Sequence, residues 1–144
     1  MSNNMEWVKQ LLQNRNSEFI KREISRIESP KLLHNIALNY NWDNGFELPN
    51  LIVRNSHCDL GTALMLFYNA DGYVILDKQN KYLVDGQKDW ITFINMLFNK
   101  LLNNEFRSIK VSYQPELSKV QKYKLKKANP NIPEMFFEGI RGKE

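Results

Sequence analysis

The sequence has few of the residues that build metal centres, disulfides and phosphate-binding loops. It contains one cysteine, two histidines and six glycines in 144 residues. One cysteine excludes an intramolecular disulfide, and with two histidines it falls short of the four ligands of a typical zinc site. The glycines are too few and too scattered to cradle a phosphate. We therefore expect neither a metal ion nor a cofactor.

Long apolar runs are also missing from the chain. The longest, residues 63–68, is far shorter than the roughly 20 residues that cross a bilayer. The N-terminus lacks the cationic region and following apolar region of a secretory signal. We expect a soluble, cytoplasmic protein with no membrane partner, and the single cysteine is compatible with a reducing compartment.

The residues that are present describe a folded, helical protein. Hydrophobic residues make up 42% of the chain and aromatic residues 12%, as in globular domains. A chain of this length buries roughly two thirds of its unfolded surface, which is enough for one core. Apolar residues recur mostly at helical spacing. These patterns predict a mainly α-helical fold: one domain over residues 1–144, a compact array with short solenoid-like helix pairs.

Turn and cap residues divide the chain into its expected helices. The predicted helices cover about residues 4–13, 17–29, 30–40, 49–55, 59–69 and 87–103, followed by a basic helix that Pro115 opens and a last apolar turn from Pro133. Residues 60–68 are apolar all round, which indicates a helix buried on most sides. We expect Asp59 to cap this helix by accepting an N–H, and Gly72 to supply its left-handed end.

The C-terminal half carries three further expectations. Residues 73–84 are compatible with a small β-hairpin, because two apolar triplets flank a polar centre. This interpretation stays open. In the basic helix, Leu117, Val120 and Tyr123 are expected on the inner side. The last turn holds Phe136 and Phe137 and is too apolar to remain undocked.

Charge is unevenly distributed along the chain. Residues 39–77 carry five carboxylates and one arginine, whereas residues 107–144 carry nine Lys or Arg and four Glu. The central carboxylates are Asp43, Glu47, Asp59, Asp71 and Asp77. Together they suggest metal ligands or an acid/base pair. Cap and turn positions explain several of them, so the structural interpretation is favoured and no catalytic or metal residue is assigned.

Two other groups invite a chemical interpretation. A thiol beside an imidazole, as in His57-Cys58, is reactive when its pKa is depressed, but neighbours in sequence rarely face each other and a buried Cys58 is favoured. The lysines of residues 119–127 suit contacts to phosphates. Such a run is more often a solvated helix face, so nucleic-acid binding is the less favoured interpretation.

The central stretch contains three short motifs: NWDNG at residues 41–45, CDLGTAL at 58–64 and ADG at 70–72. In these it resembles a bacterial family of domains of unknown function, family forty-two seventy-four. The likeness extends more loosely over about residues 30–103, and leaves a basic helical extension over about 107–144. The resemblance implies a bacterial origin and carries no activity. By analogy with other small helical bacterial proteins, it suggests an immunity protein encoded beside a toxin.

These observations lead to one main hypothesis and two alternatives. The main hypothesis is a non-enzymatic protein-binding module, an immunity-type inhibitor of a cognate bacterial toxin. Its candidate binding residues are the carboxylates Asp43, Glu47 and Asp71, with Trp42 and Tyr73 as aromatic anchors. The alternatives are a hydrolase that uses the central carboxylates and a nucleic-acid-binding protein that uses the basic C-terminal helix. The oligomeric state stays open.

Overall fold

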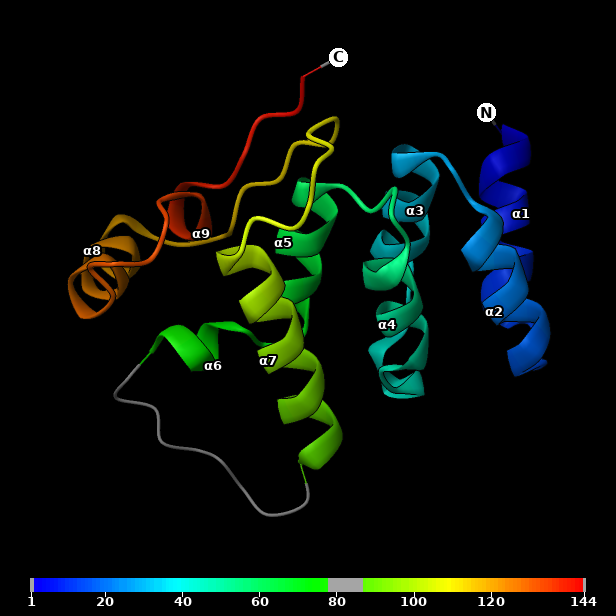
Figure 1. Ribbon diagram of the computed structural model, residues 1–144, viewed down its shortest axis with the longest axis horizontal. Helices are drawn as coiled ribbons and strands as arrows, with labels where there is room; N and C mark the ends of the chain where they lie inside the picture. Colours follow the sequence, from blue (N-terminus) through cyan, green and yellow to red (C-terminus); the bar gives the residue numbers. More distant parts are fainter. Residues whose placement is uncertain (1, 78–86, 144) are drawn as a thin grey trace.

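The computed structural model describes residues 2–77 and 87–143 and consists of helices joined by short connections (Figure 1). The chain is mainly helical, as predicted, and its described part contains no named strand. In order, the elements are α1 (Ser2–Gln13), α2 (Ser17–Arg26), α3 (Pro30–Leu38), the 3-10 helix η1 (Trp42–Asn44), α4 (Glu47–Arg54), α5 (Leu60–Asn69), α6 (Tyr73–Leu76), α7 (Lys88–Leu102), α8 (Lys119–Ala128) and α9 (Met135–Glu138).

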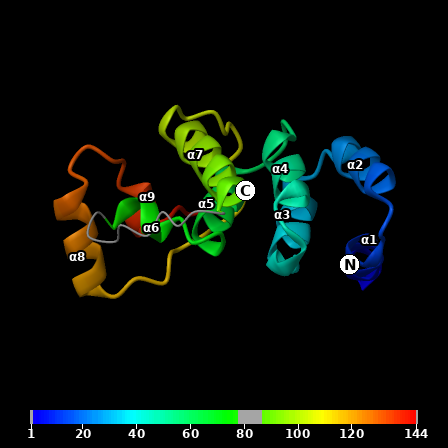
Figure 2. The same cartoon turned by 90° about the horizontal axis from the view of Figure 1, so that it is seen from below.

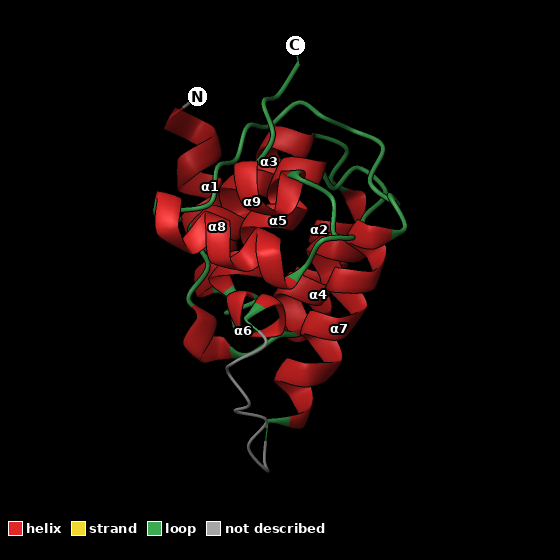
Figure 3. Cartoon of the chain, turned by 90° about the vertical axis from the view of Figure 1, so that its left-hand side faces the viewer, coloured by secondary structure: helices red, strands yellow, loops and turns green. Residues whose placement is uncertain are grey.

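Successive antiparallel helices form two layers. Figure 2 shows α1, α3 and α5 in one layer and α2, α4 and α7 in the other. Contacts between α1 and α3, α3 and α5, and α2 and α4 join neighbours within a layer, and α3–α4 and α5–α7 contacts join the layers. This is the short row of solenoid-like helix pairs that the sequence predicted. Figure 3, viewed along the row, shows α6, α8 and α9 in front of the stacked helices.

Side-chain caps fix where the helices begin. The Asn16 side chain accepts a hydrogen bond from the N–H of Phe19, and the Ser29 side chain accepts one from Leu32. Pro30 then occupies the first turn of α3. An N–H at this position would have no acceptor within the helix, so its absence from proline costs no hydrogen bond. The predicted starts of α2 and α3 are therefore correct to within a residue.

Helix α5 is the centre of the core. All eight residues from Leu60 to Phe67 are buried, as the all-round apolar pattern predicted. Helix α7 packs against α5 through Phe93, Ile94 and Leu97. One cluster of buried side chains continues from Val8 in α1 to Phe137 in α9.

The last helix docks onto this core. Phe136 and Phe137 in α9 are 0% and 1% exposed, and the ring of Phe136 contacts Phe67 and Phe98 edge to face. The Tyr68 hydroxyl also donates a hydrogen bond to the carbonyl of Phe136. Burial of each phenylalanine stabilises the fold by about 2 kcal/mol. The predicted docking of the last turn is confirmed.

The question of a hairpin or a helix, left open for residues 73–84, is decided for the first of these residues in favour of a helix. Residues Tyr73–Leu76 form the short helix α6, because Leu76 is buried at 0% exposure and Tyr73 and Ile75 also pack against the core. The remainder of the expected hairpin, residues 78–84, lies outside the described residues.

The end of α5 also differs from the prediction. Asp71 takes the left-handed conformation with φ of 63°, whereas Gly72 has φ of −59°. A Cβ at Gly72 would lie 2.5 Å from the carbonyl oxygen of Phe67. Glycine is needed there for close approach of the backbone, and aspartate tolerates the left-handed turn better than most residues.

The basic helix begins later than expected. Pro115 lies outside α8, which starts after Ser118, where Ser118 and Gln121 form a reciprocal capping box. The later start places Leu125 inside, at 3% exposure, and leaves Val120 and Tyr123 62% and 66% exposed. The prediction that Val120 and Tyr123 face inward is therefore wrong.

A buried carboxylate joins the extended segment after α7 to the start of α5. Asp59 is 0% exposed and caps α5 by accepting the N–H of Gly61 at 3.1 Å, as predicted. It also accepts bonds from the Ser108 hydroxyl at 2.6 Å and from the N–H groups of Lys110 at 2.6 Å and Val111 at 3.1 Å. We call this arrangement the Asp59 clamp.

Gly61 allows the clamp to close. A Cβ at Gly61 would lie 2.1 Å from the carbonyl oxygen of Val111, which is far inside contact distance. The segment continues to Tyr113, which exchanges backbone hydrogen bonds of 2.9 and 2.7 Å with Ile140. One end of this segment is therefore attached to the helical array through Asp59, and Tyr113 at its other end is paired with Ile140 in the C-terminal tail.

The clamp predicts a large drop in stability when it is altered. Asp59→Asn should lower the free energy of unfolding by roughly 3 kcal/mol, because an amide replaces a charged acceptor at the centre of four hydrogen bonds. Gly61→Ala should cost about 2 kcal/mol through steric overlap with Val111. Chemical denaturation measures both changes. Asp43→Asn at an exposed site should change stability by less than about 0.5 kcal/mol, and equal destabilisation at Asp59 and Asp43 would contradict the clamp.

Candidate functional site

Trp42 and Asp43 form the short 3-10 helix between α3 and α4. The Asn41 side chain accepts the N–H of Asp43 at 3.0 Å, and Gly45 ends the turn with φ of 92°. Trp42 is half-buried, with its ring 5.5 Å from that of Tyr40 and 6.1 Å from that of Phe93. These contacts hold the turn against the core, and the Asp43 side chain is exposed on it.

Asp71 and Tyr73 lie in the connection from α5 to α6. Asp71 is exposed, while Tyr73 is half-buried against the core. The indole N–H of Trp90, in the first turn of α7, donates to the carbonyl of Ala70 at 2.5 Å. Helix α7 therefore contacts both turns: Trp90 binds the α5–α6 connection and Phe93 contacts Trp42. Both turns lie at one end of the helical array, the lower end in Figure 1.

Glu47 lies apart from the other candidates, in a hollow between the α1–α2 turn and the start of α4. Its carboxylate accepts the Ser17 hydroxyl at 2.6 Å. The hollow has a volume of about 460 Å³. Its apolar lining residues are Leu12, Ile20, Leu48 and Leu51, and its polar ones include Arg15, Tyr40 and Asn44. We call it the Glu47 hollow.

Tyr40 adds a hydrogen-bonding group to the wall of this hollow. Its hydroxyl donates to the carbonyl of Gly45 at 2.6 Å, which leaves the oxygen free to accept from a ligand. Burial first, and the nearby Glu47 carboxylate second, raise the pKa of Tyr40 to about 12. Glu47 and Tyr40 therefore present acceptor oxygens beside apolar walls.

The structure thus brings the five predicted residues to one end of the array but not into one site. Asp43 and Asp71 are exposed on separate turns, and Glu47 faces α2. Sequence reasoning missed Ser17, Tyr40 and the apolar walls of the hollow. No local signal marks these residues as a site, because Ser17 and Glu47 are 30 positions apart and only the packing of α2 on α4 brings them together.

Cys58 is a core residue, as predicted. Its side chain is 2% exposed, and burial, followed by the Asp59 carboxylate, raises the pKa of the thiol to about 12. His57 is exposed and its ring nitrogen Nδ1 lies 3.3 Å from the side-chain oxygen of Asn55. A thiol with a raised pKa is protonated at neutral pH, so it does not act as a nucleophile.

The other polar groups near α5 are engaged in structural contacts. The ring nitrogen Nδ1 of His34 lies 2.9 Å from the hydroxyl of Thr62, which is fully buried. Burial lowers the pKa of His34, and the Asp59 charge partly offsets that change. The four hydrogen bonds of the Asp59 clamp leave that carboxylate no route to a substrate.

Across residues 2–77 and 87–143, no three His, Cys, Asp or Glu side chains are grouped to hold a metal ion. The Glu47 hollow contains one carboxylate residue, Glu47. Three further hollows have one each, Glu28 in two adjoining hollows and Glu138 in the third. A pair of carboxylates for acid/base catalysis is therefore not found in any of these four.

A family model described as Domain of unknown function (DUF4274) matches residues 28–102, more than half of the 144-residue chain. The chain belongs to this family. No curated protein and no solved structure matches it in the other two comparisons. The matched DUF4274 segment runs from just before α3 to the end of α7.

The two structural features described above each cross the boundary of the DUF4274 segment. The Glu47 hollow combines Tyr40 and Glu47 of the segment with Leu12 and Ser17 before it. The Asp59 clamp joins Asp59 of the segment to residues 108–111 after it. In the part of the chain that the structure describes, no helix has the length and apolar character needed to span a membrane.

The environment of Cys58 predicts slow alkylation of the native protein. With its thiol pKa raised to about 12, Cys58 should react with iodoacetamide at pH 8 far more slowly than a free cysteine, and at the ordinary rate once unfolded. Mass spectrometry of the native and denatured protein measures both rates. Rapid modification of the folded protein would show that the thiol is accessible and ionised.

Proposed function

We propose that this protein is a non-enzymatic protein-binding module, an immunity-type inhibitor that binds a cognate bacterial toxin in the cytoplasm. The proposal places the partner at the lower end of the array in Figure 1, against the Glu47 hollow and the exposed Asp43 and Asp71. The partner surface would be basic, because three carboxylates form the candidate contact.

The Glu47 hollow is the observation that carries the proposal. Its carboxylate is held by Ser17 and stands beside the leucine and isoleucine walls. A lysine or arginine side chain matches such a hollow, because its aliphatic stem packs on the apolar walls while its charged head meets the carboxylate. The turn that carries Asp43 extends the negative charge next to this hollow.

The toxin-inhibitor assignment rests on analogy. Small helical bacterial proteins without catalytic motifs are frequently encoded beside toxins, and binding requires no reactive group. The buried Cys58 and the fully bonded Asp59 argue against the hydrolase alternative. In α8, Lys122 and Lys126 are paired with Glu138, which weakens the case for phosphate contacts by that helix.

Charge reversal at the candidate surface tests the proposal. Co-expression with the product of the neighbouring gene should give a complex and protect the cell from that product's toxicity. Asp43→Lys combined with Glu47→Lys should weaken the complex at least about tenfold, because like charges would then face each other. Isothermal titration calorimetry of the purified pair measures this affinity.

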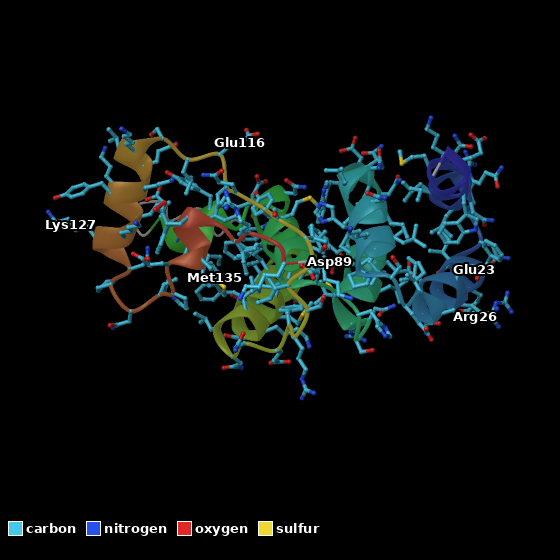
Figure 4. All side chains as sticks on the ribbon, turned by 90° about the horizontal axis from the view of Figure 1, so that it is seen from above. Glu23, Arg26, Asp89, Glu116, Lys127 and Met135 are labelled. Carbon is cyan, nitrogen blue, oxygen red and sulfur yellow. The ribbon has the colours of Figure 1, made fainter. Side chains whose placement is uncertain are left out.

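The matched control reverses two carboxylates elsewhere on the chain. Glu6 in α1 and Glu116, which points away from the body in Figure 4, are both exposed. Glu6→Lys combined with Glu116→Lys makes the same change in net charge and should leave the affinity within about threefold of wild type. Absence of both complex and protection in the wild-type pair would refute the proposal.

A further inference from the structure

The opposite end of the helical array carries a basic groove. Two hollows of about 570 and 470 Å³ adjoin there and share Glu28, Ser56 and His57 in their linings. They lie where α2 and α4 end, where α3 begins, and beside the segment after α7, at the upper end in Figure 1. Six basic residues line the two hollows: Lys21, Arg26, Arg54, Arg107, Lys110 and Lys143.

The groove accounts for the positive charge of the whole chain. Six of the 20 Lys and Arg residues line it, against one of the 16 Asp and Glu residues. Elsewhere the chain has 14 basic and 15 acidic residues, so the rest of the molecule is close to neutral. Concentrated charge of one sign along a concave surface attracts a ligand that is itself multiply charged.

The six groove cations are exposed and lack carboxylate partners within the described residues. The ion pairs found there involve Lys100, Lys122 and Lys126, none of which lines the groove. Figure 4 shows Arg26 directed outward from the α2 end of the molecule. Their charge is therefore available to a ligand. The first turn of α3, which begins at Pro30 in the groove wall, adds the positive end of a helix dipole.

We propose that this groove binds the phosphate backbone of a nucleic-acid duplex. The lining of both hollows contains no Phe, Tyr or Trp. Aromatic side chains form the stacking platforms that hold single-stranded bases. Tyrosine and tryptophan are also, with arginine, the main anchors of protein interfaces. A duplex keeps its bases stacked inside and presents repeated phosphates, which lysine and arginine contact without reading sequence.

This site differs from the protein-binding surface proposed above, which lies towards the other end of the array, and only Leu51 lines both the Glu47 hollow and the groove. It also differs from the basic helix that the sequence suggested for nucleic acid. In α8, Lys122 and Lys126 are paired with Glu138 and Lys127 lies 6.0 Å from the ring of Tyr123. The groove cations come instead from α2, α4 and two segments beyond α7.

Fluorescence anisotropy of a labelled DNA or RNA duplex of arbitrary sequence tests the proposal. The 144-residue protein should bind at about 50 mM salt and bind much more weakly towards 200 mM. Replacing Arg54, Arg107 and Lys110 together by glutamine should weaken binding at low salt more than tenfold. It should also reduce the slope of log affinity against log salt by about 0.9 for each phosphate that the variant no longer neutralises.

A second triple variant controls for net charge. Glutamine at Lys119, Lys124 and Lys127, all exposed in α8, removes the same charge outside the groove and should leave the slope unchanged. Circular dichroism checks that both variants are folded, and Lys143→Gln near the chain end provides a milder groove variant. Equal effects of the two triples, no binding at low salt, or tighter binding of poly-glutamate than of either duplex would overturn the proposal.

Discussion

The carboxylate of Asp59 connects the start of α5 to the extended segment that follows α7. An ionised side chain with no exposed surface is stable only when its oxygens are well bonded, and here four donors serve them. One donor belongs to α5 and three to residues 108–111, about 50 positions later in the chain. Gly61 permits this approach, and the bridge at Tyr113 and Ile140 then leads the chain to α9.

The antiparallel order of the helices separates the charges of the molecule. The turns after α1 and α3 meet at one end, and the ends of α2 and α4 meet at the other. Asp43 lies in the turn between α3 and α4, and Glu47 lies in the first turn of α4. Arg26 and Arg54 lie in the last turns of α2 and α4. Cations at helix C-termini are favoured by the helix dipole. The clamp then adds Arg107 and Lys110 to the basic end, so the same contact that fixes the fold also completes the groove.

Local sequence signals predicted most of the helices. They failed at the start of α8 and at the end of α5. The cap at Asp59, the buried α5 and the apolar face of α7 follow from residues within one or two turns of each other. The start of α8 was misplaced because Pro115 was interpreted as its first turn, whereas the helix begins after the cap that Ser118 and Gln121 form. Gly72 was assigned the left-handed turn that Asp71 adopts, because the close approach of Phe67 has no signature in the sequence.

The candidate sites were less predictable than the fold, because each is formed by residues that only packing brings together. Charge along the chain directed attention to residues 39–77 and to the basic C-terminal helix. The groove instead combines two cations of α2, one of α4, two of residues 107–110 and Lys143. Three of the six lie in the basic region 107–144, but outside the basic helix that the sequence singled out. Glu47 was identified, but its hollow depends on Ser17 and Leu12 from helices that the DUF4274 segment does not include.

Native-state hydrogen exchange tests the central role of the Asp59 clamp most directly. The amides of Lys110 and Val111 lie in a segment without regular secondary structure, and their acceptor is a buried carboxylate. Both amides should be protected to the level of the α5 amides, because they open only when the core opens. Exchange of Lys110 and Val111 at the rate of exposed loop amides, with α5 still protected, would contradict this role of the clamp.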